Sequence, residues 1–141
     1  MNDSERALIE RQCTKLIVAY THLIDFGEGA RVVDLFTPDG VWESPENKME
    51  GADAISAGFG TRQGMQRTSR HVCTNVAIDV VSADEATGVS YFSLYRHDGE
   101  RKGPAPLDGP VMIGQYRDRF VRTADGWRIR QRHASATFMR R

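Results

Sequence analysis

Residues 111–122 read Val-Met-Ile-Gly-Gln-Tyr-Arg-Asp-Arg-Phe-Val-Arg, and residues 127–135 read Trp-Arg-Ile-Arg-Gln-Arg-His-Ala-Ser. In the second run the odd-numbered side chains share one face and the arginines share the other, which is the period of a half-buried strand. Between the runs, Thr-Ala-Asp-Gly has the composition of a hairpin turn. We therefore predict a long antiparallel hairpin with one wet, cationic face, made of Arg128, Arg130 and Arg132. The predicted buried face carries Trp127, Ile129, Gln131, His133 and Ser135.

Working towards the N-terminus, residues 69–81 and 86–96 also alternate, and we predict that they form a second antiparallel pair. Further upstream, apolar residues recur at three- and four-residue steps from Ile9 to Ile24, which indicates one buried helix face. We expect Asp3 or Ser4 to cap this helix, which ends near Asp25. Shorter helices at residues 30–36 and 52–59 and a short strand at residues 41–44 complete the pattern.

Helices that precede a run of antiparallel strands are typical of the α+β class. We predict one domain over residues 1–141. In it, a curved antiparallel sheet of four long strands and short N-terminal strand pieces wraps round the helices as a cone-shaped barrel. The interior of such a cone is a natural site for a small molecule.

Composition narrows the classes of partner. The chain has 19 basic and 19 acidic side chains, so it lacks the electrostatic footprint of nucleic-acid binding. No stretch suits a bilayer span, and the polar N-terminus is unlike an export signal. Cys13 and Cys73 belong to different elements and to no zinc-type cluster. We predict a cytoplasmic protein with reduced thiols and no metal, and neither nucleic acid nor membrane as a partner.

Four side chains are candidates for chemistry. Asp25 ends the first helix, where the helix dipole disfavours a carboxylate; it is either an exposed turn residue or a buried group that needs a cationic partner. His71 suits proton transfer near neutral pH if its face of the strand lines the cavity, but periodicity leaves open which face is buried. His97 lies at the mouth of a strand, and His133 has the pattern of a core or cavity-edge residue.

Several known catalytic patterns do not occur in the sequence: it has no Gly-rich phosphate loop, no nucleophile elbow and no His-Glu metal pair. The chemistry that these residues support without a cofactor is proton transfer by a carboxylate and imidazoles.

Local phrases recur in an order that resembles one known family. They are Ile-Asp-Phe-Gly at 24–27, Asp-Leu-Phe-Thr-Pro-Asp-Gly at 34–40, Glu-Gly-Ala-Asp-Ala-Ile at 50–55, Arg-His-Val-Cys-Thr-Asn at 70–75, Gly-Gln-Tyr-Arg-Asp-Arg-Phe at 114–120 and Asp-Gly-Trp-Arg-Ile at 125–129. Together they resemble the SnoaL-like branch of the nuclear-transport-factor-2-like superfamily, whose fold is a cone-shaped α+β barrel. The resemblance covers nearly the whole chain.

Within that superfamily, the scytalone dehydratases are cofactor-free lyases that use an aspartate at the end of the first helix and two histidines on the sheet. The resemblance implies that Asp25 and His71 match the aspartate and the first histidine. His97 lies one residue from the second histidine in an ungapped pairing, and one residue on a strand changes the face.

The resemblance also predicts a different pocket. Two tyrosines that hold water in those enzymes are replaced here by Ile24 and, approximately, Ser44. Gln115 and Arg117 fall where those enzymes have smaller polar groups. We therefore expect a substrate other than that of the scytalone dehydratases.

The combined prediction is a cofactor-independent, dehydratase-like lyase or isomerase that acts on a small hydrophobic, cyclic carbonyl compound. Its catalytic residues would be Asp25, His71 and His97. Substrate contacts would come from Tyr20, Trp42, Phe59, Met65, Asn75, Gln115 and Arg117.

The alternative is a non-catalytic small-molecule-binding or subunit-like domain of the same fold, resembling the β subunit of ring-hydroxylating dioxygenases. Contact between Asp25 and His71 inside the cavity would favour the enzyme. We also expect a homodimer or higher homo-oligomer formed through the outer face of the sheet.

Overall fold

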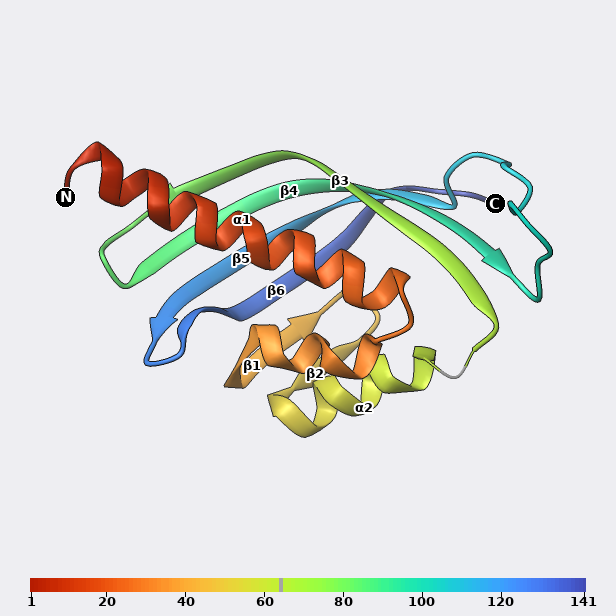
Figure 1. The fold of residues 1–141 in the computed structure, drawn as a ribbon, viewed down its shortest axis with the longest axis horizontal. Coiled ribbons are helices and arrows are strands. Elements are labelled where there is room, and N and C mark those ends of the chain that lie inside the picture. Colours follow the sequence, from red (N-terminus) through yellow and green to blue (C-terminus); the bar gives the residue numbers. More distant parts are fainter. Residues whose placement is uncertain (64) are drawn as a thin grey trace.

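The computed structural model describes residues 1–63 and 65–141. Two long helices, a short 3-10 helix and six strands follow one another in nearly the predicted order (Figure 1). They are α1 (Asp3–Asp25), the 3-10 helix η1 (Gly29–Leu35), β1 (Phe36–Glu43), β2 (Lys48–Glu50), α2 (Gly51–Gln63), β3 (Arg67–Val80), β4 (Glu85–Asp98), β5 (Met112–Thr123) and β6 (Gly126–Met139). The predicted helix at residues 30–36 is η1, and the one at 52–59 is longer than expected.

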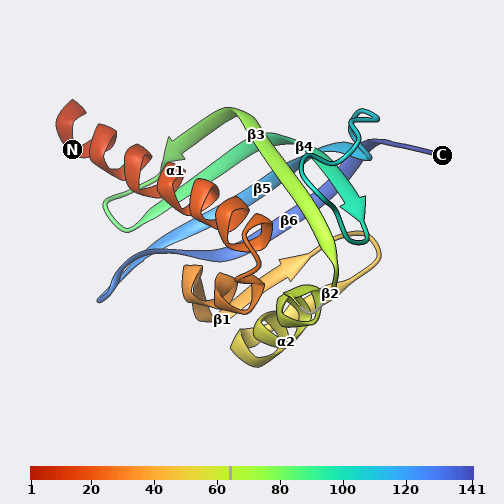
Figure 2. The same ribbon diagram turned by 45° about the vertical axis from the view of Figure 1, so that its right-hand side comes forward.

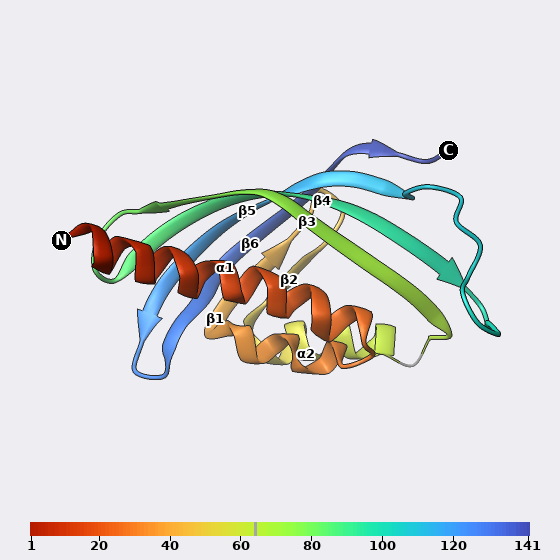
Figure 3. The ribbon, with the colours of Figure 1, turned by 45° about the horizontal axis from the view of Figure 1, so that its top comes forward.

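All six strands form one curved sheet in the order β2-β1-β6-β5-β4-β3. Neighbouring strands are antiparallel, except that β1 pairs in parallel with β6. The sheet curls without closing, so the predicted barrel is an open cone. Figure 2 and Figure 3 show α1 crossing the concave side, with η1 and α2 beside β1. The α+β class is confirmed, and the concave side is where a cavity can form.

A capping box starts α1. The Asn2 side chain accepts a hydrogen bond from the Glu5 backbone N–H at 2.9 Å, and the Glu5 carboxylate accepts one from the Asn2 N–H at 3.0 Å. Two amide groups that lack helical partners are thereby satisfied. The cap is therefore Asn2, and the expected caps Asp3 and Ser4 lie inside the helix. At the other end Gly27 has a φ of 80°, a conformation that glycine adopts at little cost.

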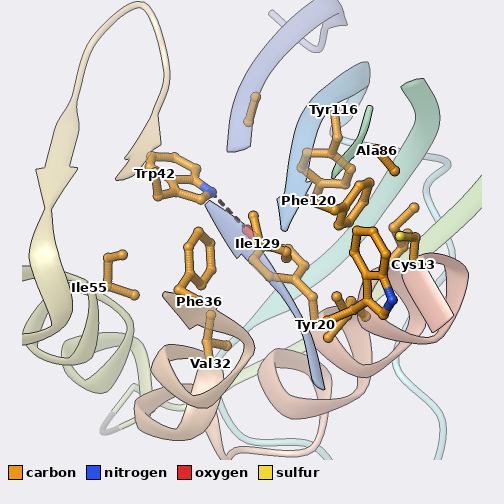
Figure 4. Packing of buried hydrophobic residues seen from close by; sticks show 14 of the residues in the cluster. Cys13, Tyr20, Val32, Phe36, Trp42, Ile55, Ala86, Tyr116, Phe120 and Ile129 are labelled. Atoms are coloured by element: carbon orange, nitrogen blue, oxygen red, sulfur yellow. Dashed lines mark hydrogen bonds between the residues drawn. The ribbon is translucent and has the colours of Figure 1, made fainter. Parts of the chain in front are cut away.

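The buried face of α1 packs on aromatic residues from α2 and the sheet. Tyr20 meets the rings of Phe59 and Tyr116 edge-on, with centroids 5.7 Å and 5.6 Å away. Figure 4 labels Tyr20 and Tyr116 and marks the hydrogen bond, 3.1 Å long, that the Trp42 indole N–H donates to the Tyr20 hydroxyl. Because Tyr20 and Trp42 come from α1 and β1, their contact fixes the helix against the edge of the cone.

A β-bulge at Arg130 changes the predicted faces of β6. Ile129 pairs with Phe120 and Gln131 pairs with Arg119, so Arg130 has no partner in the ladder. One unpaired residue shifts the alternation by one position. Trp127 and Ile129 are buried as predicted, but beyond the bulge Arg132 and Ala134 point inward. The predictions of a solvated Arg132 and of a His133 on the Ile129 face are therefore wrong.

A second bulge settles which face of β3 is buried. Thr74 pairs with Tyr91 and Ala77 with Val89, so two residues on β3 oppose one on β4. Asn75 occupies the bulge with a φ of 52°, which asparagine tolerates better than most residues. Before the bulge Ser69 and His71 face inward; after it Ile78 and Val80 pack against the core.

The structure also bears on the thiols. Cys13 and Cys73 are both free. Burial raises the pKa of the Cys13 thiol to about 12 and that of Cys73 to about 11. Within the part of the chain that the structure describes, no helix combines the length and apolar character needed to span a membrane.

Candidate functional site

A cavity of about 550 Å³ lies on the concave side of the sheet. Its lining comes from α1, β1, the end of α2, and strands β3 to β6. The apolar part is made of Ile24, Trp42, Met65, Phe92, Leu94, Met112, Ala134, Ala136, Phe138 and Met139. The volume is in the range of pockets that hold small organic ligands.

At one wall of this cavity, Asp25 and His71 form a hydrogen-bonded pair. His71 lines the cavity, and its Nδ1 lies 2.6 Å from Asp25 Oδ1. The His71 backbone N–H donates to Asp25 Oδ2 at 2.8 Å, and the Ser69 hydroxyl donates to Oδ1 at 2.8 Å. The side chains are 10% and 4% exposed for His71 and Asp25. Three donors thus fix a nearly buried carboxylate against one edge of the imidazole.

This arrangement determines what the imidazole can do. An ionised carboxylate only accepts hydrogen bonds, so Nδ1 of His71 must be the donor. In the neutral ring the lone pair is then on Nε2. No hydrogen bond or ion pair to Nε2 occurs within residues 1–63 and 65–141. Nε2 of the cavity-lining His71 can therefore act as a base, and the hydrogen bond from Nδ1 to Asp25 fixes the orientation of the ring.

The hydrogen bonds also keep Asp25 ionised. Burial alone would raise the pKa of its carboxyl, but the side chain of His71, its backbone N–H and its charge, together with the Ser69 hydroxyl, outweigh burial and hold that pKa below its usual range. Ser69 was not among the predicted site residues. It stands two positions before His71 on the same face of β3, and that alternation was the signal that could have found it.

We expect this lowered pKa to make folding stability depend on pH in acid. Its contribution is fully present above the unfolded aspartate pKa of about 3.9 and is lost as pH falls through the lower folded value. Asp25→Asn removes the titration, so the free energy of unfolding should fall less steeply below about pH 4 in the variant than in the wild type. Urea unfolding at a series of pH values measures this. Parallel stability curves for the two proteins would contradict it.

The structure brings part of the predicted contact set into the cavity. Tyr20, Trp42 and Met65 line it, as do Ile24 and Ser44. Phe59 is fully buried behind Tyr20 and Trp42, with its ring 5.7 Å from each, and is not part of the lining. Phe59 therefore supports the wall.

Other predicted residues lie elsewhere. On β4 the cavity is lined by Phe92, Leu94 and Arg96, so His97 is on the alternate face. Asn75 is exposed at the bulge of β3.

On β5 the inward residues are Gly114, Tyr116, Asp118 and Phe120, which leaves the two predicted β5 residues on the outer side. The Gln115 amide donates a hydrogen bond to the Ser135 hydroxyl and accepts one from the Thr137 hydroxyl, and Arg117 is exposed. These placements correct His97, Asn75, Gln115 and Arg117 as cavity residues.

A buried ion pair behind the cavity wall was also missed. Arg132 and Asp118 are both fully buried and joined by two hydrogen bonds of 2.7 and 2.8 Å. The guanidinium lies between the rings of Tyr20 and Tyr116, 4.3 Å and 3.9 Å from their centroids. Burial disfavours its charge, but Asp118 more than offsets this, so the pKa of Arg132 lies above its ordinary value. Simple alternation along β6 could not predict this pair, because the bulge at Arg130 turns Arg132 from the outer face to the inner one.

Among the described residues, no group of three or more His, Cys, Asp or Glu side chains could hold a metal ion.

Comparison with known proteins places this geometry in a family. Residues 5–133 match the SnoaL-like domain. A search of curated proteins finds no significant match.

Among solved structures, a protein of Novosphingobium aromaticivorans DSM 12444 provisionally assigned as a scytalone dehydratase has a TM-score of 0.85 at 20% identity, over 99% of this chain and 91% of that one. A type 2 hexachlorocyclohexane dehydrochlorinase (LinA) has a TM-score of 0.81 at 14% identity, over 99% and 92%. A protein of Catenulispora acidiphila in complex with S-DNPA has a TM-score of 0.74 at 24% identity, over 92% and 94%.

At these identities the structural likeness shows the fold, which is the NTF2-like cone. The domain match covers most of the sequence and includes Asp25, His71, Asp118 and Arg132. The chain belongs to the SnoaL-like family.

Proposed function

We propose that this protein is a cofactor-independent lyase or isomerase that removes a proton next to the carbonyl group of a small, hydrophobic, cyclic compound. The observation that carries the proposal is the Asp25–His71 pair, in which Asp25 binds Nδ1 at 2.6 Å and the nearly buried His71 lines the cavity. An imidazole held in this way is suited to general acid–base catalysis near neutral pH.

The proposed reaction begins when His71 Nε2 takes the proton and the C–H electron pair moves into the carbonyl group as an enolate. Asp25 stabilises the imidazolium that forms, because it already accepts the Nδ1 proton. In a lyase the enolate then expels a leaving group from the β carbon, giving a conjugated carbonyl compound, and the imidazolium can protonate that group. In an isomerase the imidazolium returns the proton to a different carbon.

In the proposed reaction, Tyr20 assists at the carbonyl oxygen. Its hydroxyl oxygen accepts from Trp42, and its own hydrogen has no acceptor within the described residues. Tyr20 lines the cavity, so this hydrogen can be donated to the enolate oxygen as charge develops there. In such a site one preorganised donor typically contributes a factor of about 10²–10³ to the rate.

The fold relatives support the same class of chemistry without fixing it. One is named as a dehydrochlorinase and another is provisionally assigned as a dehydratase. Both names describe eliminations. Fold alone does not transfer an activity, so the proposal rests on the site geometry.

Deuterium exchange tests the proposal without knowledge of the natural leaving group. The wild-type protein is incubated in D₂O with 1-tetralone, a hydrophobic cyclic ketone, and loss of the α-proton signal is followed by NMR. We expect exchange faster than with free imidazole at the same concentration. Binding of 1-tetralone without faster exchange would instead favour a non-catalytic binding domain.

A further inference from the structure

Among the described residues, Arg62 has no carboxylate partner, unlike the other arginines of the cavity. Three arginines line the cavity: Arg62, Arg67 and Arg96. The other two share the carboxylate of Asp98, since Arg67 Nε lies 2.9 Å and Arg96 Nε 3.4 Å from its Oδ1. For Arg62, no hydrogen bond or ion pair occurs within residues 1–63 and 65–141. The only carboxylate in the described lining, Glu46, is likewise not bonded to it.

Aromatic rings hold the Arg62 guanidinium in place. Its Cζ lies 4.7 Å from the centre of the Phe59 ring and 5.9 Å from that of Trp42. Phe59 is three residues before Arg62 on α2, so the helix itself sets this stacking. A ring face attracts a cation but offers no carboxylate oxygen, and it keeps water from one side of the guanidinium. The planar fork of N–H donors therefore stays available on the cavity side.

We propose that Arg62 is a carboxylate-binding site, and that the ligand of this cavity is a cyclic, largely apolar compound that bears a carboxylate group. A guanidinium matches a carboxylate with two parallel hydrogen bonds, and pairing is stronger where water is partly excluded. The lining supplies the rest of the match, because many of the other described lining residues are apolar.

The inference deepens the proposed function and rests on it only in naming a substrate class for the same cavity. Arg62 comes from α2, whereas His71 comes from β3, and both line one cavity. A ligand that fills the cavity can thus be anchored by its carboxylate at Arg62 while its reacting carbon lies beside His71. Anchoring of this kind raises the rate by positioning and not by chemistry.

Calorimetric titration with a matched pair of ligands tests the proposal. The probes are 2-naphthoate and 2-naphthamide at pH 7.5, which have the same rings and differ in charge. We expect the wild type to bind the naphthoate about tenfold to a hundredfold more tightly, as a charged hydrogen-bonded pair predicts. Arg62→Gln should remove this preference while changing naphthamide affinity by less than about twofold. Arg62→Lys should keep part of it, because the charge remains but the fork is lost.

Arg130→Gln is the matched control, since Arg130 is exposed on β6 and paired with Asp39 at 3.6 Å, outside the cavity lining. It should bind both ligands as the wild type does. Equal affinity of the wild type for the two ligands, no binding of either, or an equal loss of both in Arg62→Gln and Arg62→Lys would overturn the proposal. These outcomes are independent of deuterium exchange into 1-tetralone, so a failure of the carboxylate site is distinguishable from a failure of the proposed function.

Discussion

His71→Gln is expected to slow deuterium exchange into 1-tetralone by about 10²–10⁴-fold, the usual contribution of a general base. Glutamine is close to histidine in length and can still hydrogen-bond Asp25, so the wall of the cavity should persist. What it lacks is a lone pair that can take a proton near neutral pH. The rate is measured by NMR at equal protein concentrations, with thermal unfolding used to verify that the variant is folded.

His22→Gln is the control for this prediction. His22 lies on the exposed side of α1 against Phe26, with ring centroids 5.7 Å apart, and does not line the cavity. Its replacement should leave the exchange rate within about twofold, well below the loss expected for a general base. An equal loss in His22→Gln and His71→Gln, or a loss in His97→Gln as large as that in His71→Gln, would contradict the assignment of the base.

The second large effect is expected in stability, at the Asp118–Arg132 pair. Asp118→Leu should lower the free energy of unfolding by about 3–5 kcal/mol, because it leaves a fully buried guanidinium unpaired. Arg132→Met should lower the free energy of unfolding by a similar amount, because it leaves the buried Asp118 carboxylate without its partner. The double variant should lose less than either single variant, since buried ion pairs are often replaced by apolar side chains at little net cost.

Urea unfolding of the four proteins gives the coupling energy through a double-mutant cycle. The exposed pair of Arg130 and Asp39, at 3.6 Å, provides the comparison. Asp39→Asn should change stability by no more than about 1 kcal/mol, as is typical of surface pairs. Additive losses at Asp118 and Arg132, or losses no larger than that of Asp39→Asn, would show that the two buried charges do not stabilise one another.

Much of the architecture could be predicted from periodicity. The buried face of α1, the long strands and the turns between them all follow from local patterns, and these patterns extend over enough residues to be reliable. The alternation in β6 correctly placed Trp127 and Ile129 inside. It failed from Gln131 onward, because the unpaired residue Arg130 reverses the alternation of the positions that follow it and cannot be recognised from the composition.

The candidate site, too, could be predicted only in part from the sequence. Periodicity could not show which face of β3 is buried. In a regular strand His71 and Ile78 would lie on opposite faces, but the bulge at Asn75 shifts the alternation, so both point inward. Proximity of Asp25 to His71, 46 residues later, is a tertiary fact that only the family resemblance anticipated. Arg62 carried no signal, since a lone arginine near a helix end is common. The roles of these residues and the homo-oligomer stay predictions.

The parallel pairing of β1 with β6 has a consequence for the order of assembly. The Gln131 amide donates to the Glu43 carboxylate across a sequence separation of 88 residues, and the neighbouring Trp42 pairs with Arg132. Contacts this distant in sequence carry the entropic cost of closing a loop that spans more than half of the chain. The hairpins of β3 with β4 and of β5 with β6 close much shorter loops. The wall that carries Trp42 should therefore dock last, and ligand binding should lag behind formation of the sheet during refolding.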